Sequence, residues 1–98
     1  MTKGKAPVHL LARFPVEDVV RVLQAGDEQY GTHNWHGETF SRVQFAAKII
    51  RHTLAWLRGE DADPDDGASH IAHAAADALI ILEMERAGLG VDDRIKRP

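Results

Sequence analysis

Apolar residues recur at helical spacing in three stretches of the chain, and this pattern predicts three main helices. In the first stretch they stand three or four positions apart: Val16, Val19, Val20 and Leu23. Pro15 suits the first position of a helix because its missing N–H would be unpaired there. Gly31 can end the helix by adopting a left-handed conformation. The first helix is therefore predicted over residues 15–31.

The second stretch has a longer apolar face, made of Phe40, Val43, Ala46, Ala47, Ile50, Leu54 and Leu57. Glu38 or Thr39 can open this helix, and Gly59 stops it after about Arg58. The preceding loop over residues 31–37 is polar and bounded by glycines, yet it contains a tryptophan and two histidines. Loops of this kind often carry functional residues.

The third helix is predicted to begin between Asp66 and Ser69 and to end at about Ala87, before Gly88. It is apolar nearly all round, which is typical of a helix that packs on most of its sides. The chain is thus expected to be an all-α protein, a small bundle of three main helices. We expect a single domain over residues 1–98, with an arm over 1–14, a helical core over 15–87 and a charged tail over 88–98.

Composition narrows the possible functions. The chain has 98 residues, of which 44% are hydrophobic, and a bundle this small would gain by pairing with a second copy. We therefore expect a homo-oligomer, either a dimer or a tetramer. A formal net charge of -3 argues against a duplex-DNA binder, which draws affinity from concentrated Lys and Arg.

The chain contains no cysteine, which excludes disulfides and thiolate zinc sites. The apolar runs are too short for a membrane span, and the N-terminal stretch lacks the apolar core and cleavage site of a signal peptide. No membrane association and a cytoplasmic location are therefore expected.

Three polar residues share one stripe of the predicted third helix. At 100 degrees per residue, His70, His73 and Asp77 fall within about 60 degrees of one another. On a mostly apolar helix this stripe is expected to be at least half buried, where histidines stay neutral and can coordinate a metal. The alternative is structural: His70 caps the helix, His73 makes one buried hydrogen bond, and Asp77 pairs with an arginine such as Arg51 or Arg42.

The second helix offers a complementary face, on which Ser41, Lys48 and His52 lie together with Arg51 beside them. Its positive groups could meet phosphates, although a solvated amphipathic face is the simpler interpretation, above all for Arg42 and Arg58. His52 would face the third helix if the two helices pack antiparallel across their short connection.

That connection is acidic, and its carboxylates Asp61, Asp63, Asp65 and Asp66 are hard oxygen ligands of the kind that Mg²⁺ and Mn²⁺ prefer. Most of them are expected to be plain solvated charges. The sequence contains no EF-hand, P-loop, nucleophile elbow or H-E-x-x-H motif, so those classes are excluded.

Two strings of residues resemble a known family. The first is Gly26 to Tyr30-Gly31 with Asn34-Trp35, and the second runs through Arg51-His52, Ala55-Trp56-Leu57, Gly59-Glu60, Asp61, Pro64, Gly67, His70, His73 and Asp77. Together they are similar to the small phage-type dATP/dGTP diphosphohydrolases, which look like relatives of the MazG-like all-α nucleotide pyrophosphohydrolases. The resemblance covers roughly residues 15–87, and its second string is the more specific.

The resemblance implies a Mg²⁺- or Mn²⁺-dependent hydrolase that splits a purine deoxynucleoside triphosphate into the monophosphate and pyrophosphate. In some phages such an activity would shape the nucleotide pool for modified DNA. Asp77 matches the last residue of the family's E-x-x-D motif and would hold a metal, while Ala74 occupies the place of its glutamate. The E-x-x-E half expected on the preceding helix is also absent, since Lys48, Arg51 and His52 stand in that region.

The site is therefore expected to use substitutes for the missing glutamates. We assign metal binding to Asp61, His70, His73 and Asp77, and catalysis to His52, His73 and Asp77. Lys48 and Arg51 would clamp the triphosphate, Trp35 would stack on the base or plug the end of the core, and Asn34 would read the base edge. The expected reaction is in-line attack of a metal-activated water on the α-phosphorus.

Two other functions stay open from the sequence. One is a divergent metal phosphohydrolase of the HD type, although the chain has no adjacent His-Asp pair. The other is a non-enzymatic helical module that presents its acidic loop to a protein partner.

Overall fold

The described part of the chain contains three α-helices, as its apolar pattern predicts. The computed structural model describes residues 4–30 and 40–96, with the side chains of residues 29 and 30 excepted. The helices are α1 (Arg13–Tyr30), α2 (Arg42–Leu57) and α3 (His70–Ala87), and a short 3-10 turn over Val8–Leu10 precedes them. The all-α class is confirmed.

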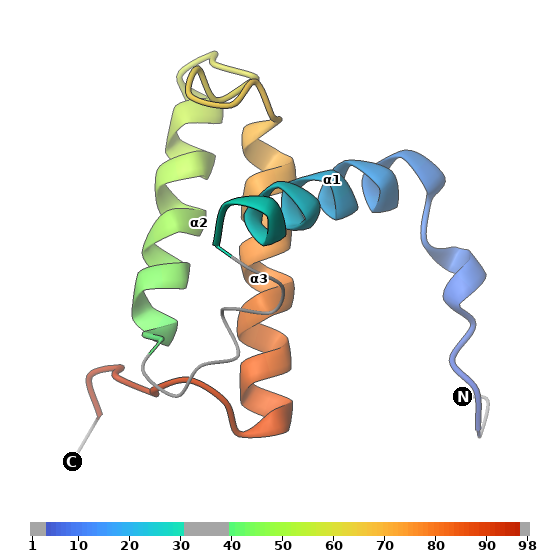
Figure 1. Ribbon diagram of the computed structural model, residues 1–98, viewed down its shortest axis with the longest axis vertical. Coiled ribbons are helices and arrows are strands. Elements are labelled where there is room, and N and C mark those ends of the chain that lie inside the picture. Colours follow the sequence, from blue (N-terminus) through green and yellow to red (C-terminus); the bar gives the residue numbers. More distant parts are fainter. Residues whose placement is uncertain (1–3, 31–39, 97–98) are drawn as a thin grey trace.

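The helices α2 and α3 form an antiparallel pair, joined at one end by the acidic loop over residues 58–69 (Figure 1). The helix α1 runs across this pair at a steep angle and packs against α3. The end of α1 nearest the pair therefore faces the groove between α2 and α3. No helix in the described part of the chain has the length and apolar character needed to cross a membrane.

Serine caps fix where two helices begin. Ser69 Oγ accepts a hydrogen bond from the backbone N–H of Ala72 at 3.2 Å, so Ser69 is the N-cap and α3 begins at His70, one residue after the expected interval of 66–69. Ser41 Oγ accepts one from the N–H of Gln44 at 3.0 Å, and α2 therefore begins at Arg42, later than the expected start at residue 38 or 39.

The core lies between α2 and α3. Phe45, Ile80 and Met84 are buried, and partly buried side chains pack around them: Leu23, Phe40, Ile81 and Leu89. Three alanines of α3 are buried as well: Ala72, Ala74 and Ala76. Because alanine has no side chain beyond Cβ, neighbouring elements can approach this part of α3 closely.

Several apolar side chains on the outer faces of the helix pair are exposed in the part of the chain that the structure describes. Ile71, Leu79 and Leu82 of α3 are about half exposed, as are Ile50 and Leu57 of α2. The expectation that α3 packs on most of its sides is therefore wrong for the single chain. Pairing with a second copy stays a prediction.

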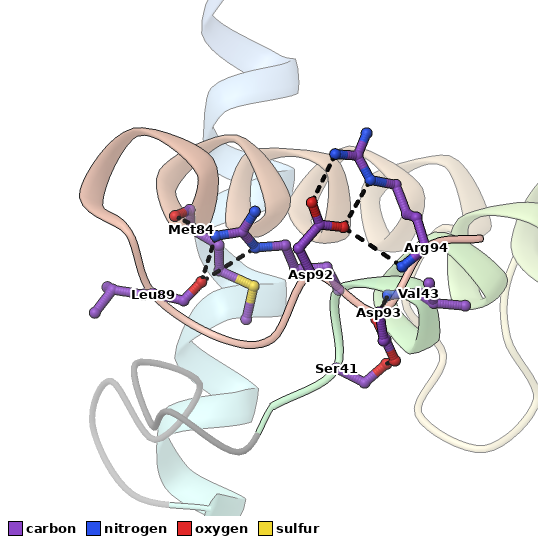
Figure 2. A network of polar contacts seen from close by, with 8 residues as sticks. Ser41, Val43, Met84, Leu89, Asp92, Asp93 and Arg94 are labelled. Carbon is purple, nitrogen blue, oxygen red and sulfur yellow. Dashed lines mark hydrogen bonds and ion pairs between the residues drawn. The ribbon is translucent and has the colours of Figure 1, made fainter. Parts of the chain in front are cut away.

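The segment after α3 returns to the start of α2 (Figure 2). The Arg42 guanidinium donates hydrogen bonds to the carbonyl oxygens of Leu89, at 2.9 and 3.1 Å, and Met84, at 3.1 Å. The expectation that Arg42 lies on a solvated face is wrong, because its side chain is partly buried and hydrogen-bonds to backbone carbonyls at and just after the end of α3.

Backbone contacts and a second cap complete this junction. Phe40 and Arg42 exchange backbone hydrogen bonds with Val91, at 2.8 and 3.1 Å. The Asp93 carboxylate accepts hydrogen bonds from the Ser41 hydroxyl and from the N–H of Val43 (Figure 2). These bonds hold the pKa of Asp93 below its usual value. The first part of the region predicted to be a tail is thus attached to the bundle.

This junction requires glycine at position 90. Gly90 has φ +69°, and a Cβ there would lie 2.9 Å from the carbonyl oxygen of Phe40 and 3.1 Å from the sulfur of Met84. Gly88 has the same φ, but nothing lies within 4 Å of the place of its Cβ. The two positions therefore separate the cost of the left-handed backbone from the cost of a steric clash.

We predict that Gly90→Ala destabilises the protein more than Gly88→Ala does. Both variants should lose about 1 kcal/mol to backbone strain, and Gly90→Ala should lose about 1–3 kcal/mol more because backbone must shift. Urea denaturation of the two variants and the wild type measures the difference. Equal losses would show that the segment is not held as described.

Candidate functional site

A cavity of about 920 Å³ opens where α1 meets the α2–α3 pair. One side is apolar and includes Leu23, Phe40 and Phe45. The other side is polar and carries cations, histidines and carboxylates: Lys48, Arg51, His52, Asp63, Asp65, Asp66, His70, His73 and Asp77. The cavity therefore combines an apolar wall with a dense set of ionisable groups.

Three histidines meet at this polar side. His52 comes from α2, and its Nδ1 lies 2.8 Å from Nδ1 of His70 on α3. The rings of His52 and His73 stack in parallel, with centroids 4.5 Å apart and planes 4° apart. The prediction that His52 faces the third helix is confirmed, because the two helices do pack antiparallel.

Glu60 orients His70. His70 is 4% exposed, and its Nε2 lies 2.6 Å from Oε1 of Glu60. A carboxylate only accepts hydrogen bonds, so the Nε2–H of His70 donates to it. The two Nδ1 atoms are in hydrogen-bond contact, so one of these two rings donates its Nδ1–H to the other. Glu60 belongs to the second string of residues that resembles the known family, but it was not among the site residues predicted from the sequence.

Asp66 holds His73 in a similar way. The Nε2–H of His73 donates to Oδ2 of Asp66 at 2.8 Å, and Oδ1 of Asp66 accepts a hydrogen bond from the N–H of Ala68 at 2.9 Å. Burial alone would raise the pKa of Asp66, but the Ala68 N–H and His73 outweigh it and hold the pKa below its usual value. Asp66 is therefore an anion that faces the histidines.

The cluster favours neutral imidazole at His52. Burial lowers the pKa of His52, and the neighbouring His73 and His70 lower it further. A neutral imidazole carries the lone pair that a metal ligand needs. The expectation that the polar stripe is at least half buried is confirmed for His70, His73 and Asp77, of which His70 is the most buried.

Asp63 links the histidines into two groups of donors. Ligand atoms of His52, Asp63 and His70 lie within 4.8 Å of one another, and so do those of Asp63, Asp66 and His73. The loop fixes Asp63, since its N–H donates to the carbonyl of Ala68 at 2.8 Å and its Oδ1 accepts from the N–H of Asp65 at 2.9 Å. The spacing of both groups would suit a metal ion.

Neither of the two carboxylates predicted from the sequence to be metal ligands, Asp61 and Asp77, belongs to these groups of donors. Asp61 is exposed and belongs to neither group of donors, and its backbone carbonyl accepts a hydrogen bond from the N–H of His70 at 2.9 Å. Asp77 lines the same cavity as the histidines but is also outside both groups. The structure thus brings Asp63, rather than Asp61, to His70.

Asp77 is a partly buried carboxyl group whose surroundings disfavour its ionised form. Burial raises its pKa to about 6, against the opposing effects of Lys48, His73 and Arg51. Among the described residues no hydrogen bond or ion pair holds its carboxylate. The alternative in which Asp77 pairs with Arg42 or Arg51 is therefore not found in this part of the chain.

The two residues predicted to bind phosphate lie in the same cavity as the histidines. Lys48 and Arg51 both line it, and the Lys48 ammonium also lies 4.9 Å from the centre of the Phe45 ring. Both side chains are exposed, so they are accessible to a ligand. The predicted base-binding residues Asn34 and Trp35 lie outside the described residues.

Comparison with known proteins adds independent information. A family model described as dATP/dGTP diphosphohydrolase, N-terminal, matches residues 1–94. A protein of Salmonella phage PMBT28 named dATP/dGTP diphosphohydrolase is 37% identical over 92 residues, which cover 94% of this chain and 31% of that relative. The chain thus spans about a third of the relative's length. No solved structure matches the chain.

The raised pKa of Asp77 predicts a pH-dependent cost to stability. An unfolded aspartate titrates near pH 4, whereas Asp77 titrates near 6 in the folded protein, so folding takes up a proton between these values. This contribution to stability is lost as the pH rises through that range. We predict that Asp77→Asn is more stable than the wild type at pH 7.5, by about 1 kcal/mol, since solvent screens part of the penalty.

Urea denaturation at pH 4 and pH 7.5 tests this prediction, with the exposed Asp61→Asn as the matched control. The gain of Asp77→Asn should vanish at pH 4, where the wild-type carboxyl is protonated in the folded state. A variant that is less stable than the wild type at pH 7.5 would contradict it.

Proposed function

Because this chain belongs to the dATP/dGTP diphosphohydrolase N-terminal family, we propose that it supplies a nucleotide site for metal-dependent hydrolysis of dATP or dGTP. The products would be the deoxynucleoside monophosphate and pyrophosphate. One observation carries the proposal: a single cavity combines Lys48 and Arg51 with the histidine–carboxylate cluster and an apolar wall. A purine nucleoside triphosphate needs all three of these chemical features.

The residues present fit a divalent cation. His52, His70 and His73 offer imidazole nitrogens, and Asp63 and Asp66 offer carboxylate oxygens at distances that suit a shared ion. Mg²⁺ or Mn²⁺ is the ion that the family resemblance implies. When bound, such an ion would supply positive charge that stabilises the phosphates and makes water at the site more acidic.

Lys48 and Arg51 would bind the triphosphate. A guanidinium can donate two parallel hydrogen bonds to one phosphate, whereas an ammonium acts as a point charge. Both residues stand on α2 beside His52, so they would draw the phosphates toward the histidine–carboxylate cluster. The apolar wall with Leu23, Phe40 and Phe45 would then accommodate the base.

Asp77 is our candidate general base. In the proposed reaction, a water oxygen attacks the α-phosphorus, the bond to the bridging oxygen of the β-phosphate breaks, and pyrophosphate leaves. Asp77 would accept the proton of the attacking water, because a carboxylate with a pKa of about 6 is a stronger base than an ordinary one and is still ionised at neutral pH. His52 and His73 would hold the cation rather than move the proton.

The alternative of an interaction module fits the acidic loop less well. In that function the carboxylates would point outward to a partner. Instead Asp66 and Glu60 accept hydrogen bonds from His73 and His70, and the loop backbone holds Asp63 beside them. The loop therefore serves the cavity.

We predict that Lys48→Ala and Arg51→Ala each lower kcat/KM for dATP and dGTP about 10- to 100-fold, because each removes a charge-assisted hydrogen bond to phosphate. Arg58→Ala is the matched control, since Arg58 is an exposed cation at the end of α2 outside the cavity. Release of pyrophosphate in the presence of Mn²⁺ measures the effect.

Thermal unfolding provides a second measurement that does not depend on turnover. With Mn²⁺, dATP should raise the Tm of the wild type and of Arg58→Ala by mass action, and less so for Arg51→Ala. Equal pyrophosphate release and equal Tm shifts in all four proteins would refute the site assignment.

A further inference from the structure

We infer that the histidine–carboxylate cluster binds two divalent transition-metal ions that share Asp63. The first ion would be held by His52, His70 and Asp63, and the second by His73, Asp66 and Asp63. The inference rests on the proposed metal dependence, and it adds the donors, the number of ions and their chemical class.

The first site has the geometry of two imidazoles that share an ion. Two nitrogens that each lie about 2.0–2.1 Å from one ion are separated by roughly 3 Å at the angles usual for such sites. The Nδ1 atoms of His52 and His70 lie 2.8 Å apart, and an oxygen of Asp63 lies within 4.8 Å of the donor atoms of both. The three groups thus lie close enough together to serve as ligands of one ion.

The surroundings of His70 also suit a ligand. Its Nε2–H donates to Glu60, so in the neutral ring Nδ1 is the nitrogen that can bind the proposed ion in place of its contact with His52. A carboxylate behind a coordinating histidine is the usual outer partner in such sites, where it fixes the ring and makes the ligating nitrogen more basic. The ion would replace the Nδ1 proton of His52, which that ring can carry on Nε2 instead.

The second site is built in the same way. Nε2 of His73 and Oδ2 of Asp66 lie 2.8 Å apart, near the separation of two neighbouring ligands, and Asp63 supplies the third donor. An ion there would replace the Nε2 proton, which His73 can carry on Nδ1. Three protein ligands at each ion would leave positions for water and phosphate.

The donor types favour transition ions over Mg²⁺. Together the two sites contain three imidazole nitrogens, whereas Mg²⁺ prefers oxygen ligands and retains its waters. Imidazole suits Fe²⁺, Ni²⁺ and Zn²⁺, and Co²⁺ lies between Fe²⁺ and Ni²⁺ in the general order of affinity. The charge is also nearly balanced, because the anions Asp63, Asp66 and the outer Glu60 face two divalent cations.

Titration of the metal-stripped chain with Co²⁺ or Mg²⁺ tests the inference without nucleotide. Calorimetry and native mass spectrometry should find two Co²⁺ ions per chain, bound at least 10-fold more tightly than Mg²⁺. Visible absorption of Co²⁺ should report mixed nitrogen and oxygen coordination.

Variants locate each ion. His52→Ala and His73→Ala should each bind one Co²⁺, and Asp63→Ala should weaken both sites. Glu60→Gln should keep two ions but lose about 10- to 100-fold in affinity at one of them. Asp61→Asn is the matched control, because this neighbouring carboxylate is exposed and outside both groups, so it should bind two ions like the wild type.

Several results would overturn the inference. They are a single Co²⁺ in the wild type, equal affinity for Mg²⁺, or loss of an ion in Asp61→Asn. Circular dichroism confirms that each variant is folded, and His52→Ala tests the first site without removing the buried His70.

The experiments distinguish failure of the metal centre from failure of the proposed function. Two bound Co²⁺ ions with neither nucleotide binding nor pyrophosphate release would refute the function and keep the metal centre. Hydrolysis with Mg²⁺ by a chain that binds no Co²⁺ would refute the metal centre and keep the function.

Discussion

The buried imidazole of His70 is the contact on which the site depends. It lies at the first residue of α3, where its backbone N–H bonds to Asp61, its Nε2–H bonds to Glu60 and its Nδ1 meets His52 of α2. Through these bonds, a single residue connects the acidic loop, α2 and α3. Because a buried polar group without partners costs about 1–3 kcal/mol, the ring also constrains where those partners lie. Asp63 and Asp66 are held nearby by hydrogen bonds to the backbone of Ala68.

The two ends of the α2–α3 pair are held by different means. At the loop end, histidines and carboxylates make the contacts, and at the other end Arg42 hydrogen-bonds to the carbonyls of Met84 and Leu89. The apolar cluster of Phe45, Ile80 and Met84 lies between them. The helix pair is thus held together at both of its ends. It does not need to fill the space beside α1 with core side chains, and the cavity lies there.

The ionisable groups on the polar side of the cavity lower the stability of the folded protein. Three histidines gather in one place where burial and their neighbours disfavour charge on His52, and burial likewise disfavours the ionised form of Asp77. Such groups are more common at functional sites than in structural cores, since a site must place reactive groups where they are not at their most stable. The same groups that weaken the bundle therefore supply the chemistry proposed for it.

Much of this protein was determined locally by its sequence. The three helices, the cap at Ser69 and the common stripe of His70, His73 and Asp77 follow from helical spacing and from short-range hydrogen bonds. That His52 faces α3 followed from a short loop, which makes two helices antiparallel. The tertiary structure alone decided that Asp63 rather than Asp61 joins the histidines, that Glu60 orients His70, and that Arg42 turns inward. These outcomes depend on the path of an irregular loop and on contacts between residues far apart in the chain, which periodicity does not encode.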